Sequence, residues 1–107
     1  MSRSGAPNGT GSARVTYRAR GVVQGVGFRY FVRREAVRLD HTGWVANQPD
    51  GTIEAVAEGA ANALERLTEV LSVGPPGAEV TEIDVRWGPP TGEFVGFAIR
   101  AGSHPGD

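Results

Sequence analysis

A chain of 107 residues, 39% of them hydrophobic, can bury one modest core, so we expect one folded domain with little room for a second. The chain has no cysteine, which excludes disulfide bonds and thiolate chemistry, and no apolar run approaches the ~20 residues that span a bilayer. Its net charge of −1 argues against a dedicated nucleic-acid binder. The lack of cysteine permits a reducing cytoplasm, and we expect a cytoplasmic protein with no membrane and no nucleic-acid partner.

The charge is distributed unevenly along the chain. Residues 14–38 contain seven arginines and one glutamate (7 − 1 = +6), whereas residues 39–100 contain three arginines and ten acidic residues (3 − 10 = −7). Positive potential is therefore concentrated near the start of the chain, where it suits a small anion as well as a polyanion.

The two ends differ in composition from the rest. Residues 1–13 are rich in Gly, Ser, Pro and Asn and lack the apolar segment of a signal peptide, so we expect a disordered N-terminal leader. Residues 101–107 are expected to form a similar C-terminal tail. The folded domain should then comprise residues 14–100, which show no internal repeat.

The first strand and the first helix are marked by their periodicity. Residues 14–23 alternate between apolar and polar side chains, which predicts a strand with Val15, Tyr17 and Ala19 on one face. After a run of glycines, apolar residues recur at helical spacing from Phe28 onward, with arginines off that stripe. An amphipathic helix is therefore expected to begin near Phe28.

The remaining elements complete a familiar order. Residues 42–59 predict two strands around a Pro-Asp-Gly turn, and a second helix is expected from about Ala60 to the GPPG run at 74–77. Residues 80–87 alternate again, and the run GFAIRA at 96–101 predicts a short last strand. The order β-α-β-β-α-β-β predicts an α+β ferredoxin-like sandwich, an antiparallel sheet with two helices on one face.

The glycine-rich stretch GVVQGVGFRYF at 21–31 does not fit the common nucleotide motifs. A Walker A loop needs a lysine, and the chain has none; the dinucleotide fingerprint fails because residue 30 is a tyrosine. What remains is a strand, a glycine-rich loop and a helix with an arginine in its first turn. In that setting backbone N–H groups and the positive end of the helix can converge on an anion.

An RNA-binding hypothesis must also be considered. The run QGVGFRYF resembles the RNP1 motif of RNA-recognition domains, which share the same general architecture. RNP1, however, lies on an interior strand well downstream, whereas here the run follows the first strand and opens a helix. Val26 also stands where RNP1 has a stacking aromatic residue. An RNA-binding ferredoxin-like domain is therefore the less favoured alternative.

Three separated runs carry a resemblance to a family. GVVQGVGFR, then GWVANQPDGTIEAVAEG and finally GFAIR resemble the acylphosphatases, over nearly all of residues 14–100. The resemblance implies hydrolysis of carboxyl-phosphate anhydrides, with Arg29 and Asn47 matching the catalytic arginine and asparagine of that family. It further implies a phosphate-binding loop made of Gln24, Gly25, Val26, Gly27 and Phe28.

The chemistry explains why few side chains are needed. Hydrolysis of an acyl phosphate expels a carboxylate, whose conjugate acid has a pKa of roughly 4, so the leaving group departs without a general acid. Charge on the phosphoryl oxygens calls for a planar fork of donors, which Arg29 supplies, while the amide of Asn47 can hold the attacking water. No cofactor and no metal are expected. The expected partners are a small-molecule acyl phosphate and inorganic phosphate, the product and an inhibitor, with the protein a monomer.

Simpler interpretations remain beside these assignments. Arg29 could be one more solvated arginine of its helix, and Asn47, just before a turn, could be an ordinary turn residue. The whole domain could also be a non-catalytic phosphate- or acyl-phosphate-binding module, because acylphosphatase-like domains are appended to larger enzymes such as the carbamoyl-transfer factor of hydrogenase maturation.

Asp40 and His41 stand where similar proteins commonly have a glycine and an apolar residue, so we expect a less stable exit from the first helix.

Overall fold

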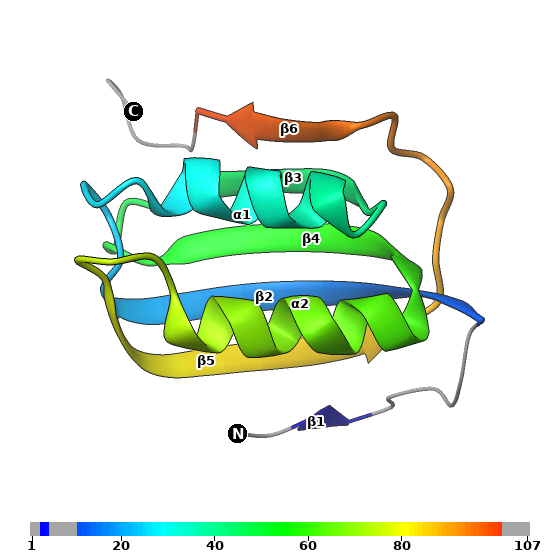
Figure 1. The fold of residues 1–107 in the computed structure, drawn as a ribbon, viewed down its shortest axis with the longest axis horizontal. Coiled ribbons are helices and arrows are strands. Elements are labelled where there is room, and N and C mark those ends of the chain that lie inside the picture. The colour runs from blue at the N-terminus through cyan, green and yellow to red at the C-terminus, as the bar shows by residue number, and fades with distance from the viewer. Residues whose placement is uncertain (1–2, 5–10, 102–107) are drawn as a thin grey trace.

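The computed structural model describes residues 3–4 and 11–101. From its second strand onward the chain follows the predicted β-α-β-β-α-β-β order, which is confirmed (Figure 1). Neither helix in this part of the chain is both long and apolar enough to cross a membrane. The elements are β1 Arg3–Ser4, β2 Ser12–Val22, α1 Phe28–Arg38, β3 Thr42–Asn47, β4 Ile53–Ala60, α2 Ala61–Val73, β5 Glu79–Gly88 and β6 Phe97–Arg100.

The six strands form one sheet in the order β1-β5-β2-β4-β3-β6. The four central strands are antiparallel, as predicted, but β6 runs parallel to β3 and β1 runs parallel to β5. The sheet is therefore mixed and not wholly antiparallel. The difference arises because residues 89–96 carry the chain along one end of the sheet from β5 to its far edge, where β6 pairs with β3 (Figure 1).

The start of the fold also differs in detail from the expected boundaries. β2 begins at Ser12, two residues before the expected start of the strand at residue 14, and Ser12 pairs with Ala60 of β4. β1 lies within the segment expected to be a leader. Residues 1–2, 5–10 and 102–107 lie outside the described residues, so the disorder of the leader and the tail stays a prediction.

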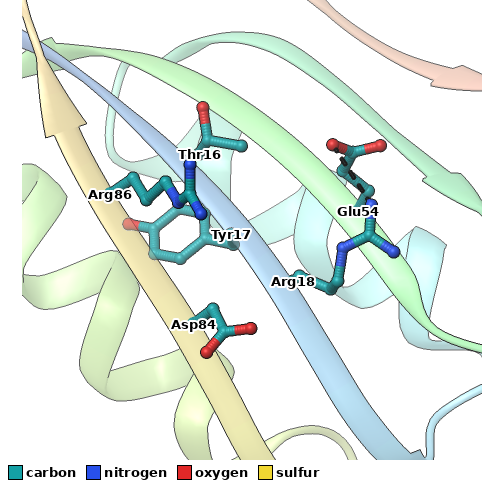
Figure 2. Close-up of a pocket in the computed structure, with 6 residues that line it drawn as sticks. All are labelled: Thr16, Tyr17, Arg18, Glu54, Asp84 and Arg86. Carbon is teal, nitrogen blue, oxygen red and sulfur yellow. Dashed lines mark ion pairs between the residues drawn. The ribbon is translucent and has the colours of Figure 1, made fainter. Parts of the chain in front are cut away.

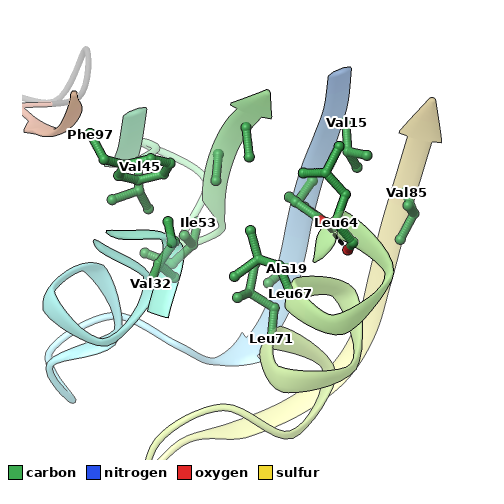
Figure 3. Packing of buried hydrophobic residues seen from close by; sticks show 14 of the residues in the cluster. Val15, Ala19, Val32, Val45, Ile53, Leu64, Leu67, Leu71, Val85 and Phe97 are labelled. Atoms are coloured by element: carbon green, nitrogen blue, oxygen red, sulfur yellow. Dashed lines mark hydrogen bonds between the residues drawn. The ribbon is translucent and has the colours of Figure 1, made fainter. Parts of the chain in front are cut away.

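Both helices cover the same face of the sheet, and the core lies between them and the strands (Figures 1 and 3). The faces predicted to be apolar on β2 and α1 are buried, as is a leucine stripe on α2, and burying one valine, leucine or phenylalanine side chain is worth about 1.5–3 kcal/mol. The Tyr17 hydroxyl lies 2.8 Å from Thr68 Oγ1 and 3.2 Å from the Leu64 carbonyl oxygen, which fixes α2 against β2. The buried stripes are Val15, Tyr17 and Ala19 on β2, Phe28, Val32 and Ala36 on α1, and Leu64, Leu67 and Leu71 on α2.

The opposite face of the sheet carries no helix and is covered with ion pairs. Each arginine that points out from β2 meets an acidic residue of a neighbouring strand or turn, at N–O distances between 3.2 and 3.8 Å. The acidic second part of the chain thus neutralises much of the positive charge of the first part. The pairs are Arg14 with Glu58, Arg18 with Asp50 and Glu54, and Arg20 with Glu82.

A buried carboxylate holds the connection between β5 and β6. Glu58 is 5% exposed and accepts hydrogen bonds from the backbone N–H groups of Thr91 and Gly92, and from the Thr91 hydroxyl and Arg14. Burial acts to raise the pKa of Glu58, but the hydrogen bonds from Gly92 and Thr91 outweigh it and hold the pKa below its ordinary value. The loop is therefore anchored by an ionised carboxylate.

The exit of α1 carries the two departures noted in the sequence. Asp40 adopts a left-handed backbone with φ 61°, the only non-glycine residue of the described chain with a positive φ, and such a conformation is costly for an L-residue. The next residue, His41, is 3% exposed and lies against Gly59. Burial lowers the pKa of His41 from 6.5 to about 4, so the imidazole is neutral in the folded protein at neutral pH.

We predict that His41 makes the fold sensitive to acid. The folded pKa lies below the unfolded one, so its contribution is complete above pH 6.5 and is lost as the pH falls toward 4. Between pH 7 and pH 4.5 the loss should be roughly 2 kcal/mol. In urea denaturation at both pH values, His41→Leu should lose less stability than the parent protein. Equal losses of unfolding free energy in the two proteins would show that His41 is not the source of the acid sensitivity.

Candidate active site

The loop between β2 and α1 leaves the start of the helix open. Gly25 and Gly27 have φ values of 77° and 76°, a left-handed backbone that other residues adopt only with strain. Gly27 is the N-cap of α1; no described side chain caps this helix, and its first turn contains no acidic residue. The first N–H groups of α1 therefore point out of the helix end without a side-chain acceptor, an arrangement suited to an anion.

A small cavity of about 120 Å³ lies at this helix start. It brings together Arg29 from the first turn of α1 and Asn47 from the end of β3, two residues that are separated by 18 positions in sequence. The predicted loop residues Gly25, Gly27 and Phe28 also line it. The remaining lining residues are Val23 and Tyr30.

Asn47 does not play the part of an ordinary turn residue. It is the last residue of β3, pairs with Ile53 of β4 and is 7% exposed. The side chain that caps the following turn belongs to Asp50, whose Oδ1 accepts hydrogen bonds from the Thr52 N–H and hydroxyl at 3.1 and 2.6 Å. These bonds from Thr52 hold the pKa of Asp50 below its ordinary value. Asn47 instead lines the cavity.

The other arginines of α1 do not line the cavity and make their contacts elsewhere. Arg33 donates from Nε to the Phe97 carbonyl oxygen at 3.0 Å, which ties the helix to β6. Arg34 and Arg38 both pair with Glu35, whose pKa is lowered chiefly by the hydrogen bond from Arg38. Arg29 is the arginine of this helix that lines the cavity.

Gln24 and Val26 do not line the cavity, although they belong to the predicted phosphate-binding loop. The Gln24 amide donates from Nε2 to the carbonyl oxygens of Gln48 and Thr52, at 2.8 and 3.0 Å. Val26 packs against the hydrophobic core. Gln24 therefore holds the loop before α1 against the turn that follows Asn47.

Sequence reasoning did not single out Val23 and Tyr30 as lining residues. Val23 directly follows the last residue of β2, and its side chain is 1% exposed. Tyr30 directly follows Arg29 in the first turn of α1, which is the only sequence signal that could have placed it at the cavity. Most of its surface, 70%, is exposed.

A larger hollow of about 250 Å³ lies on the open face of the sheet (Figure 2). It is crossed by the ion pair between Arg18 and Glu54 and has neither a glycine-rich loop nor a helix start beside it. In the part of the chain that the structure describes, no group of three or more His, Cys, Asp or Glu side chains is placed to hold a metal ion. The cavity at the start of α1 is therefore the candidate active site. The larger hollow is lined by Thr16, Tyr17, Arg18, Glu54, Asp84 and Arg86.

Comparison with known proteins identifies the family. Residues 15–99 match the acylphosphatase family. The chain belongs to this family. The acylphosphatase of Salinibacter ruber is 51% identical over 87 residues, which are 81% of this chain and 92% of that protein. The crystal structure of acylphosphatase from Bacillus subtilis superposes with a TM-score of 0.80 at 40% identity, over 82% of this chain and 98% of that one.

The same fold also occurs inside a much larger protein. Full-length HypF, solved in a phosphate- and nucleotide-bound form, is similar with a TM-score of 0.78 and 26% identity, over 90% of this chain but 13% of that one. The acylphosphatase fold therefore exists both as a chain of about this length and as one domain of a longer protein.

We predict that removing the Gln24 amide loosens the site. Gln24→Met keeps the length of the side chain but loses two hydrogen bonds, each worth about 1 kcal/mol, so the free energy of unfolding should fall by roughly 2 kcal/mol. Urea denaturation measures this change. Gln48→Met is the matched control, because that amide bonds Glu54 at the rim of the same turn and does not reach the loop. A loss in the control as large as in Gln24→Met would contradict the role of Gln24.

Proposed function

We propose that this chain hydrolyses acyl phosphates to a carboxylate and inorganic phosphate, with no metal ion and no cofactor. One observation carries the proposal: Arg29 of α1 and Asn47 of β3 line the same small cavity, at a helix start that no described side chain caps. Membership of the acylphosphatase family supports the same chemistry.

The proposed mechanism is an in-line displacement at phosphorus. The guanidinium of Arg29 and the N–H groups of the loop and the first turn of α1 hold the phosphoryl oxygens, where charge accumulates in the transition state. Water held by the Asn47 amide attacks as the bond from phosphorus to the acyl oxygen breaks. The carboxylate leaves with the electron pair of that bond, and the proton of the water passes to phosphate or to solvent. No general acid is needed, because a carboxylate is a stable leaving group.

The phosphate-binding loop is part of this proposal, with two kinds of contribution. Gly25, Gly27 and Phe28 line the cavity and can offer backbone N–H groups, whereas Gln24 and Val26 position the loop from behind.

We further propose that the protein acts in the cytoplasm as a monomer on small-molecule substrates. The absence of cysteine fits a reducing compartment.

Two alternatives are less well supported. A non-catalytic phosphate-binding module could use the same arginine and loop, but relatives as similar as 51% identical are acylphosphatases, which favours the enzyme. The RNA-binding hypothesis is disfavoured because the RNP1-like run forms the loop and the start of α1, and because ion pairs cover the open face where such domains stack bases. On that face the Arg100 guanidinium already lies over the Trp44 ring, 4.7 Å from its centre.

The decisive experiment is hydrolysis of benzoyl phosphate in the presence of EDTA, with inorganic phosphate titrated as a competitor. Turnover that phosphate inhibits competitively would support a metal-independent phosphatase. A folded protein that binds phosphate without turnover would instead be a binding module. Binding to RNA that weakens steeply with salt, with acyl phosphates left intact, would favour the RNA-binding alternative.

We predict that Arg29→Lys lowers kcat for benzoyl phosphate by at least 10²-fold. Lysine keeps the positive charge but loses the planar fork that contacts two phosphoryl oxygens at once. The protein should still fold, as thermal denaturation would show. Arg34→Lys is the matched control on the same helix, because the Arg34 side chain is 70% exposed and pairs with Glu35 outside the cavity. Full activity of Arg29→Lys would refute the assigned role.

Asn47→Ala should lower kcat far more than it weakens the binding of inorganic phosphate. Loss of one positioning group that acts in the transition state typically costs about 10²-fold or more, whereas the phosphate contacts of Arg29 and the loop remain. The two quantities are kcat for benzoyl phosphate and the inhibition constant of phosphate. Asn62→Ala, an exposed position on α2, serves as the control. A variant with weaker phosphate binding and unchanged kcat would argue against water positioning.

A further inference from the structure

The cavity at the start of α1 is small. Its volume of about 120 Å³ is well below the ~300–1,000 Å³ of typical ligand pockets, so it suits a compact group such as a phosphoryl group better than a whole substrate. A substrate whose phosphoryl group occupies the cavity must therefore extend its acyl group past the rim. The side chains at that rim decide which acyl groups are bound well.

Most of the lining side chains cannot contact an acyl group. Val23 and Phe28 are 1% and 2% exposed, so their side chains belong to the core, and the Phe28 ring packs edge-on against Phe31 with 6.1 Å between ring centres. The two lining glycines have no side chain, and Arg29 and Asn47 are polar. Among the lining residues, Tyr30 is therefore the one whose side chain can offer an apolar surface to an acyl group.

Tyr30 is exposed in a way that suits a ligand contact. Its side chain is 70% exposed while it lines the cavity, and it makes no hydrogen bond or ring contact with another side chain of the described chain. The neighbouring aromatic residue, Phe31, is instead partly buried against the core and covered by the Arg34 guanidinium at 5.6 Å. The Tyr30 ring can therefore be covered by a ligand without disturbing the fold.

Resting on the proposed function, we infer that Tyr30 is the acyl-group contact of this site and sets its substrate preference. The ring packs against an aromatic or extended apolar acyl group, while a short acyl group such as acetyl does not reach far enough to cover it. The site thus favours aroyl phosphates over acetyl phosphate. A single aromatic contact of this kind changes binding or rate by about 2- to 10-fold.

The test compares kcat/KM for benzoyl phosphate and for acetyl phosphate. Tyr30→Ala should lower the value for benzoyl phosphate about 2- to 10-fold and leave acetyl phosphate nearly unchanged, whereas Tyr30→Phe should retain the preference of the parent protein. Val37→Ala, which removes an exposed apolar side chain near the other end of α1, is the control. Equal losses for both substrates, or no loss for either, would overturn the inference.

A binding measurement separates this inference from the proposed function. Phenylphosphonate and methylphosphonate present the same anionic group with and without a ring and cannot be hydrolysed at an anhydride bond. Calorimetry should show tighter binding of phenylphosphonate to the parent protein, and Tyr30→Ala should abolish that difference. This result in a protein without turnover would support the Tyr30 contact while the proposed hydrolysis fails. Equal affinities of the parent protein for the two phosphonates would overturn the contact even if hydrolysis is observed.

Discussion

Two hydrogen bonds from the Gln24 amide hold together the two halves of the candidate site. They join the loop before α1, which carries Arg29, to the turn after β3, which follows Asn47. The register of the sheet makes this possible, because Ile53 of β4 pairs with Ala19 of β2 on one side and with Asn47 of β3 on the other. Catalysis by positioning depends on placing the reacting groups to well within 1 Å, so this link between the loop and the turn supports the geometry that the proposed mechanism requires.

The pairing of charges elsewhere in the fold favours anion binding at the cavity at the start of α1. The arginines of β2 are paired with acidic residues across the open face, and the remaining arginines of α1 are engaged by Glu35 or by the Phe97 carbonyl oxygen. An anion that approaches the start of α1 therefore meets Arg29 and the helix N–H groups as the positive groups built into the cavity itself. The neutralised pairs elsewhere stabilise the sheet without drawing the anion to competing positions.

Much of this arrangement could be predicted from the sequence, because it depends on local patterns. Alternation and helical spacing identify which faces of β2, α1 and α2 are buried, and the glycine-rich run predicts an open helix start. The parallel pairing of β6 with β3 could not be predicted, because it depends on the path of residues 89–96 around the sheet. Long-range hydrogen bonds were equally hidden: nothing local to Gln24 shows that its amide reaches residues 48 and 52. The burial of His41 against Gly59 is hidden for the same reason.

The proposed chemistry places no titrating side chain at the reacting atoms. An arginine guanidinium stays protonated in proteins and the asparagine amide does not ionise, so the charge of the proposed catalytic pair is the same in mild acid and mild base. The pH dependence of hydrolysis should then report the ionisation of the substrate's phosphoryl group and the stability of the fold. On the acid side the fold is limited by groups far from the reaction, since His41 must stay neutral and Glu58 must stay ionised to hold their places. Catalysis and acid stability are thereby assigned to separate parts of this small chain.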